Sequence, residues 1–278
     1  MNWHIVADSS CDLFDLTECP PGTDFATVPF AITIGGKTFI DDENMRVDEM
    51  LDANEQHGVS AHTACPSAQA WMERFSPPGP VLAFTISSEL SGSYNSACAA
   101  KQMLLEKEPE KQIAIIDTKA TGPETALLIR KACSLIREGL SVKSIEKKLV
   151  EAAERTHILF ALASYYNLVR AGRVSRIVGI IASGLHLCGI GVGSDEGKIE
   201  MCCKTRGQQN TIRAMVDEIK KIGLNGKEII ISHCHNFEGA LALKSKICEI
   251  WNDIKVDIIP TRGLDSFYAE RHGLIVGF

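Results

Sequence analysis

The chain has 278 residues, of which 45% are hydrophobic and 23% are charged. These proportions are typical of a globular protein and exclude wholesale disorder, and the length allows two domains or one large one. The net charge of −6, from 29 Lys and Arg against 35 Asp and Glu, argues against a general nucleic-acid-binding protein, which would carry a basic surface.

Short apolar runs alternate with longer amphipathic runs along the chain. The runs that predict strands are residues 3–7, 27–34, 37–40, 81–86, 113–117, 158–163, 228–232 and 256–260. The runs that predict helices are residues 47–56, 67–75, 94–106, 124–137, 142–155, 167–171, 208–222 and 238–251. Alternation of this kind is typical of parallel sheets covered by helices.

Two predicted hairpins interrupt this alternation. Gly35 and Gly36 separate two short apolar runs, and Asp195-Glu196-Gly197 separates residues 190–193 from residues 198–203. Such turns join antiparallel strands. We therefore predict an α/β protein in two domains. The N-terminal domain, residues 1–156, has a mainly parallel sheet covered by helices, and the C-terminal domain, residues 157–278, has a mixed sheet.

The sequence shows neither an export signal nor a membrane span. Residues 1–6 are too short and too lightly charged for a signal peptide. The longest uncharged stretch, residues 177–194, contains five glycines and falls short of the ~20 apolar residues of a spanning helix. We expect a cytoplasmic protein. Its cysteines, such as Cys98 and Cys133 in predicted helices, are then expected to be reduced thiols.

Common cofactor and metal motifs are missing from the sequence. It has no G-x-x-x-x-G-K-[ST] phosphate loop and no G-x-S-x-G nucleophile elbow. A G-x-G-x-G run is formed by Gly189, Gly191 and Gly193, but it does not have the glycine spacing of a dinucleotide-binding fingerprint. His233 and His235 would share one face of a strand, but no third metal ligand has a diagnostic spacing. We predict neither a cofactor nor a metal site.

Three hydroxyl-rich segments follow predicted strands or precede predicted helices. They are residues 8–10 with Ser10, residues 63–67 with Thr63, and residues 87–93 with Ser91, Gly92 and Ser93. Ligands of open α/β sheets bind outside the carboxyl ends of the strands, and helix N-termini attract anions. These segments therefore predict an anion site with neutral donors. Each hydroxyl taken singly is equally explained as a helix cap.

Arginines form a second set of candidate ligand contacts. Arg170 and Arg173 flank Gly172, and Arg206 follows the second hairpin. An arginine can bind a carboxylate or a phosphate with two hydrogen bonds, and it can equally be a surface residue.

These segments, in this order, resemble the DegV family over essentially the whole chain. The most specific runs are Ser87-Ser88-Glu89-Leu90-Ser91-Gly92-Ser93 and Gly172-Arg173-Val174-Ser175. The other matching segments are residues 8–10, 27–30, 63–67, 116–118 and 204–207, together with Asp41. The resemblance implies a two-domain α/β protein that binds a long-chain fatty acid between its domains. It also implies that Thr63 and Ser91 hold the carboxylate and that Arg173 and Arg206 lie near the opening.

Some members of that family deliver the bound acid to a separate fatty-acid kinase, so the resemblance implies a protein that is not itself a catalyst. The chain departs from the family pattern at Ala64 and Cys65 and near its end. Many members have a His-x-Gly-Pro-Gly run there whose histidine reaches the site. Alignment on Gly277 places that histidine near Glu270, and His272 is the nearby histidine in this sequence.

Two other functions stay open from the residues. A hydrolase or transferase for an acyl substrate would need a base beside a Ser91 nucleophile, and His62 or His272 are the candidates. A regulatory module would use the same pocket to sense lipid. For a fatty-acid site, residues 160–162 and the Gly-rich residues 177–193 are candidates to line the acyl tunnel, and they can equally be ordinary core.

Overall fold

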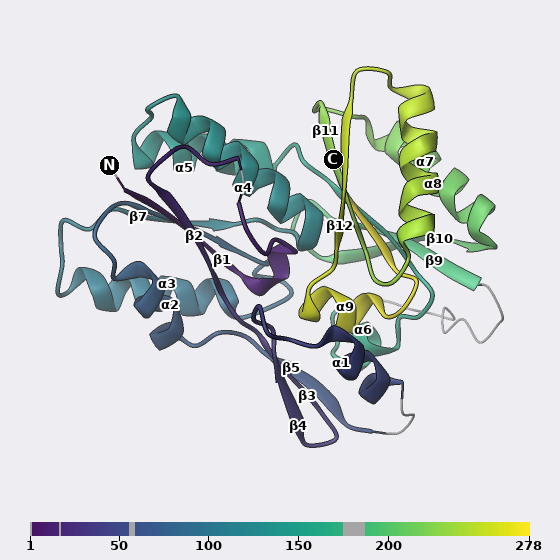
Figure 1. The fold of residues 1–278 in the computed structure, drawn as a ribbon, viewed down its shortest axis with the longest axis horizontal. Helices are drawn as coiled ribbons and strands as arrows, with labels where there is room; N and C mark the ends of the chain where they lie inside the picture. Colours follow the sequence, from purple (N-terminus) through teal and green to yellow (C-terminus); the bar gives the residue numbers. More distant parts are fainter. Residues whose placement is uncertain (1, 17, 56–58, 175–186) are drawn as a thin grey trace.

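The computed structural model describes residues 2–16, 18–55, 59–174 and 187–278, and their strands form three sheets (Figure 1). The predicted tunnel residues 177–186 and Ser175 lie outside the described residues. Two larger sheets take their strands from opposite sides of residue 156, and a small sheet lies below them in Figure 1. The division into two domains at residue 156 stays a prediction.

The first sheet is fully parallel, as predicted, with the order β2-β1-β6-β7. Its strands are β1 Trp3–Asp8, β2 Thr23–Val28, β6 Val81–Thr85 and β7 Ile113–Asp117. Successive residues face opposite helical layers, because side chains alternate along a strand. Val6 packs in the cluster with α2 (Ala68–Phe75) and α3 (Ser93–Leu105), whereas Ile5 packs in the cluster with α4 (Gly122–Arg137) and α5 (Val142–Ala153).

The small sheet, β4-β3-β5, is antiparallel and contains the predicted hairpin. Its strands are β3 Ala31–Ile34, β4 Lys37–Ile40 and β5 Ala61–Ala64, and α1 (Val47–Asn54) follows β4 in the chain. Gly35 and Gly36 have φ of +57° and +85°, as a two-residue hairpin turn requires. The prediction of one strand over residues 27–34 is wrong. Pro29 has no N–H to donate, so β2 ends at Val28 and β3 joins another sheet.

The third sheet is mixed, as predicted, with the order β10-β9-β8-β13-β11-β12. Its strands are β8 Ile158–Leu162, β9 Leu187–Gly193, β10 Ile199–Arg206, β11 Glu228–His233, β12 Lys255–Pro260 and β13 Leu274–Gly277. The helices α7 (Gln208–Ile222) and α8 (Phe237–Ile250) pack on one face, and α6 (Tyr166–Arg170) and α9 (Gly263–Ala269) on the other. The short helix η1 (Ser9–Cys11) follows β1.

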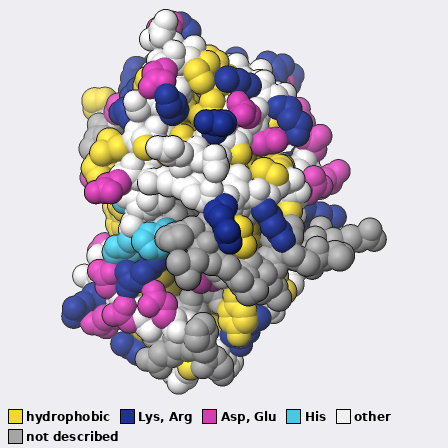
Figure 2. Space-filling model, turned by 90° about the vertical axis from the view of Figure 1, so that its right-hand side faces the viewer, with side chains coloured by type: hydrophobic (Ala, Val, Ile, Leu, Met, Phe, Trp, Pro, Cys, Tyr) yellow, Lys and Arg dark blue, Asp and Glu magenta, His cyan; other side chains and the backbone are white. Residues whose placement is uncertain are grey.

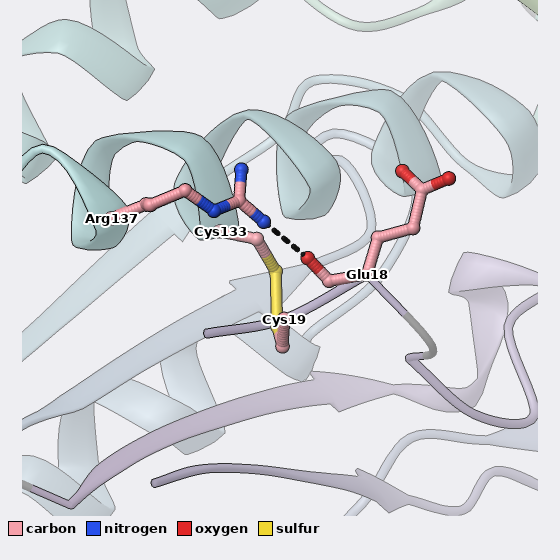
Figure 3. The surroundings of a disulfide bond; sticks show 4 residues. All are labelled: Glu18, Cys19, Cys133 and Arg137. Atoms are coloured by element: carbon pink, nitrogen blue, oxygen red, sulfur yellow. Dashed lines mark hydrogen bonds between the residues drawn. A yellow bond between two sulfur atoms is a disulfide. The ribbon is translucent and has the colours of Figure 1, made fainter. Parts of the chain in front are cut away.

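The expectation that Cys133 is a reduced thiol is wrong in this structure. Cys19 and Cys133 form a disulfide, with their Cα atoms 5.1 Å apart (Figure 3). Arg137, one turn further along α4, donates from Nη2 to the Glu18 carbonyl at 2.7 Å and holds the same loop. The two cysteines are 114 residues apart, so their proximity comes from the fold and not from a sequence motif.

The surface shown in Figure 2 mixes Lys and Arg with Asp and Glu, so that face has no continuous basic area. Within the four described ranges, no helix is long and apolar enough to cross a membrane.

Candidate functional site

A cavity of about 330 Å³ lies between the loops of the first sheet and one face of the third sheet. Its volume is at the lower end of the range for small-molecule sites, about 300–1,000 Å³. We call one side the loop wall: Phe30, residues 63–65, Ile86, residues 90–92 and residues 119–121. We call the other side the sheet wall: Ile158, Phe160, Leu162, Gly193, Ile199 and Ile275. Helix α9 contributes Leu264, Asp265, Tyr268 and Ala269.

Ser91 lies at the turn into α3, so the loop wall includes a helix N-terminus. The Ser91 N–H donates to the Ser87 carbonyl at 3.1 Å, and the Ser91 hydroxyl accepts from the Ser93 N–H at 3.3 Å. Both interpretations of this hydroxyl therefore apply, since Ser91 accepts from the Ser93 N–H at the helix start and also lines the cavity. The adjacent Gly92, also on the lining, is the N-cap residue of α3.

Thr63 meets a residue that sequence reasoning missed. Its hydroxyl lies 3.0 Å from the hydroxyl of Tyr268 on α9, 205 residues away, and both line the cavity. The family pattern places a ligand-contacting residue in this part of the chain. It aligns that residue with Glu270, two positions after Tyr268. Glu270 accepts a hydrogen bond from the Ser164 hydroxyl at 2.8 Å and does not line the cavity.

The two predicted arginines lie in different places. Arg173 lines the cavity, and its Nε donates to the Leu90 carbonyl at 3.0 Å, which ties the segment after α6 to the loop wall. Arg206 ends β10, is exposed and does not line the cavity. His272 is also exposed and off the lining; it has φ +72°, and its N–H donates to the Cys234 carbonyl at 2.8 Å.

Ser10 and Ser93 do not line the cavity, because a buried carboxylate holds their hydroxyls. Asp8 accepts from the Ser10 hydroxyl at 2.5 Å, from the Ser93 hydroxyl at 2.6 Å and from the Ile86 N–H at 3.0 Å. Burial raises the pKa of Asp8, although these hydrogen bonds lower it. Asp8 thus joins η1, the end of β6 and the start of α3. We leave Ser10 and Ser93 out of the residues proposed to contact ligand.

The sheet wall is apolar and depends on glycines. Ile158, Phe160 and Leu162 are alternate residues of β8, so they face the cavity together. A Cβ at Gly191 on β9 would lie 2.5 Å from the Phe160 ring, and one at Gly193 would lie 2.7 Å from Ile158. The G-x-G-x-G run therefore gives the cavity-facing side chains of β8 room to lie against β9.

The turn between β9 and β10 joins the two walls. Ser87 donates from its hydroxyl to the Gly197 carbonyl at 2.7 Å, and Lys119 donates from Nζ to the Asp195 carbonyl at 3.0 Å. A Cβ at Gly197 would lie 2.3 Å from the Ser87 hydroxyl, so the close approach requires glycine. Lys198 adds an ion pair with Glu89 at 3.5 Å.

The site offers no histidine base to a serine nucleophile among the described residues. His62 is exposed on β5, where alternation turns its side chain to the face opposite Thr63, and none of the described histidines lines the cavity. His235 pairs instead with Asp48, at 3.2 Å. In the described parts of the chain, no group of three His, Cys, Asp or Glu side chains is placed to hold a metal ion.

Comparisons with known proteins agree over the whole chain. A family model described as an uncharacterised protein of the DegV family matches residues 2–265. A DegV domain-containing protein of Streptococcus pneumoniae is 34% identical over 278 residues, which covers 100% of this chain and 99% of that protein. A DegV domain-containing protein of Streptococcus gordonii is 35% identical with the same coverage.

Two solved structures extend the similarity to three dimensions. The fatty acid kinase (Fak) B3 protein of S. pneumoniae, loaded with linoleic acid, has a TM-score of 0.96 and 34% identity, and the match covers 100% of this chain and 99% of that one. A DegV family protein of Eubacterium eligens, loaded with heptadecanoic acid, has a TM-score of 0.93 and 32% identity, with 99% and 98% covered.

Proposed function

The chain belongs to the DegV family, and from that premise we propose that it binds a long-chain fatty acid in the cavity between the loop wall and the sheet wall. The observation that carries the proposal is the division of the lining. Hydroxyls of Thr63, Ser91 and Tyr268 occur on one side, and the apolar face of β8 forms the other. The two similar structures named above hold a linoleic and a heptadecanoic acid.

The three hydroxyls can hold a carboxylate without a cation. Thr63 and Tyr268 bond to each other, which uses one of their two hydroxyl hydrogens and leaves the other for the ligand. Ser91 accepts from the Ser93 N–H, so its own hydrogen is also left for the ligand. Two O–H donors are thus left for the two oxygens of one carboxylate.

The acyl tail supplies most of the affinity. Burial of a 16-carbon tail gains roughly 0.8 kcal/mol per CH₂, on the order of 11 kcal/mol before costs. Ordering of the tail and loss of its translational freedom offset a large part of this gain. The hydroxyls then decide how the acid is oriented.

The protein presents the acid and is not itself a catalyst in this proposal, since Ser91 has no histidine beside it among the described residues. A separate fatty-acid kinase is the partner that the name of the S. pneumoniae relative suggests. Arg206 is exposed and outside the lining, so it is suited to contact such a partner. Arg206→Gln should then abolish acyl-phosphate formation by a fatty-acid kinase and leave acid binding unchanged. Loss of acid binding in this variant would contradict that role.

Organic extraction of the purified, folded protein followed by mass spectrometry tests the binding function. We expect a nearly stoichiometric free fatty acid. Ser91→Ala should weaken binding of linoleic acid by about 0.5–1.5 kcal/mol. Ser144→Ala is the matched control, because Ser144 is a hydroxyl residue of α5 away from the cavity. An empty extract, together with failure to bind added linoleic acid, would overturn the proposal.

A further inference from the structure

The start of α9 is surrounded by buried carboxylates. Asp41 accepts hydrogen bonds from the N–H groups of Gly263 at 2.8 Å and Leu264 at 2.9 Å, and it lies 3.7 Å from Nε of Arg262. Asp41 and Arg262 are 1% and 2% exposed. One guanidinium and one carboxylate therefore neutralise each other here, and the remaining buried carboxylates need another form of compensation.

Two of those carboxylates each have one oxygen without a partner. Asp12 accepts from the Arg262 N–H through Oδ1 at 2.7 Å, and Asp265 accepts from the Thr121 hydroxyl through Oδ1 at 2.8 Å. The Oδ2 atoms of both are buried and have no hydrogen bond within the described residues. A Cβ at Gly122 would lie 2.6 Å from Asp265 Oδ2 and 2.9 Å from Asp12 Oδ2, so the two oxygens flank one point.

One proton satisfies both oxygens. Two buried carboxylates side by side cannot both ionise without a large energetic cost, and a protonated carboxyl can donate to an ionised one. Burial raises the pKa of Asp12 to about 7 and raises that of Asp265 well above its usual value. The buried Ser232 hydroxyl lowers the pKa of Asp12, and the charge of Asp12 raises the pKa of Asp265, so one carboxyl of the pair keeps its proton when the other ionises.

The cations that line the cavity with Asp265 are Lys119, Arg173 and Lys198, and they contact the Asp195 carbonyl, the Leu90 carbonyl and Glu89 respectively. The titratable and charged groups that act on this pair are Cys11 in η1, Asp41 after β4, Cys234 after β11, and Arg262 before α9. Burial raises the pKa of both thiols, so they are neutral. Arg262 is the cation of this set, and it forms an ion pair with Asp41.

The pair is linked to the acyl site through α9. Asp265 lines the cavity, and Tyr268 lies one helical turn later on the same helix, with its hydroxyl 3.0 Å from Thr63. Ionised Asp265 would push α9 away from Asp12 and would place a negative charge on the lining. Both effects oppose a bound carboxylate.

We propose that Asp12 and Asp265 share one proton, and that this proton positions α9 so that Tyr268 can hold the ligand carboxylate. Asp265 and Asp12 are positioning residues in this scheme. Removal of the proton under alkaline conditions releases the fatty acid. The inference rests on the proposed function, because it concerns the same cavity.

The test is the affinity for linoleic acid from about pH 7, above which the pair holds one proton, to about pH 10. We expect the wild-type affinity to fall by about tenfold over this range, since one proton is lost with the ligand. Asp265→Asn keeps an oxygen for Thr121 and supplies an N–H to Asp12. Its affinity should show no such fall between about pH 7 and about pH 10. Comparison of the two proteins cancels the titration of the ligand itself.

Two further variants complete the experiment. Asp12→Asn should also remove the pH dependence, and it replaces Asp265→Asn if that variant fails to fold. Glu124→Gln is the control: Glu124 is buried with a pKa raised to about 8, but it lies outside this cavity, so its variant should keep the wild-type pH profile. A wild-type affinity that does not change with pH, or an Asn variant with an unchanged profile, would overturn the inference and leave the proposed function in place. Absence of binding at every pH would overturn the proposed function.

Discussion

The loop wall and the sheet wall of the cavity are held in place by different forces. On the loop wall, hydrogen bonds to the buried Asp8 carboxylate fix Ile86 and the start of α3, and Asp41 holds the start of α9 in the same way. On the sheet wall, the strand ladders hold the backbone, and the apolar side chains of Phe160 and its neighbours are held by packing against the glycines of β9. The difference teaches that orientation and affinity for one ligand can come from separate parts of the molecule, and substitutions on each wall should separate them.

The largest effect should follow the loss of a buried carboxylate behind the loop wall. Asp41→Ala leaves Arg262 without its charge partner and two N–H groups of α9 without an acceptor. We expect the free energy of unfolding to fall by about 3–5 kcal/mol. Urea denaturation measures it. Asp24→Ala is the control, because the Asp24 side chain is 73% exposed, and a similar loss in both variants would contradict the prediction.

A methyl group on the sheet wall should have the next largest effect. In Gly191→Ala the new Cβ would lie 2.5 Å from the Phe160 ring and 2.6 Å from the Glu200 carbonyl. We expect a stability loss of about 1–3 kcal/mol and a smaller bound-acid content in extracts. At Gly226 the nearest atom to a new Cβ is 3.9 Å away, so Gly226→Ala should change neither quantity. If Gly191→Ala changed neither the stability nor the bound-acid content, the sheet wall would have to be able to move.

The hydroxyl pair should affect binding without affecting stability. Thr63→Val and Tyr268→Phe each remove one member of the pair, and each should weaken linoleic acid binding by about 0.5–1.5 kcal/mol. The double variant should lose less than the sum, since the two hydroxyls bond to each other. Thr33→Val removes a hydroxyl from a similar pair with Thr38, outside the cavity, and should bind as the wild type does. Calorimetric titration distinguishes these cases, and strict additivity would contradict the shared role.

The smallest effect should come from the exposed ion pair between the two walls. The side chains of Lys198 and Glu89 are 52% and 45% exposed, so solvent screens their attraction. Lys198→Gln should change the unfolding free energy by less than about 0.5 kcal/mol. A larger loss in thermal or urea denaturation would mean that this pair, and not the buried Ser87–Gly197 hydrogen bond, joins the walls.

The sequence predicted both large sheets because their strands are continuous apolar runs separated by amphipathic helices. It did not predict β5, whose Ala61-His62-Thr63-Ala64 run has little strand preference, or the central strand β13. It also did not predict α9, whose first N–H groups are bound by Asp41, far away in the sequence. Tyr268 and Asp265 were missed for the same reason.

The predicted hydroxyl contacts show a second limit of prediction from the sequence. Their positions after strands and before helices were visible in the sequence, and four predicted contacts, Thr63, Ser91, Gly92 and Arg173, do line one cavity. The directions of the hydroxyls were not visible, because Asp8 draws Ser10 and Ser93 inward through contacts that span up to 85 residues. Whether the four lining residues contact the acid stays a prediction.

The place of β13 in the third sheet has a consequence for synthesis on the ribosome. Its residues, Leu274–Gly277, pair with β8 on one side and with β11 on the other, so they connect two halves of the sheet that do not otherwise pair. The parallel sheet can form while translation continues, because its strands end at Asp117. The third sheet has to wait until residue 277 has left the exit tunnel. A nascent chain therefore cannot capture an acyl ligand in the complete cavity before translation of this segment ends.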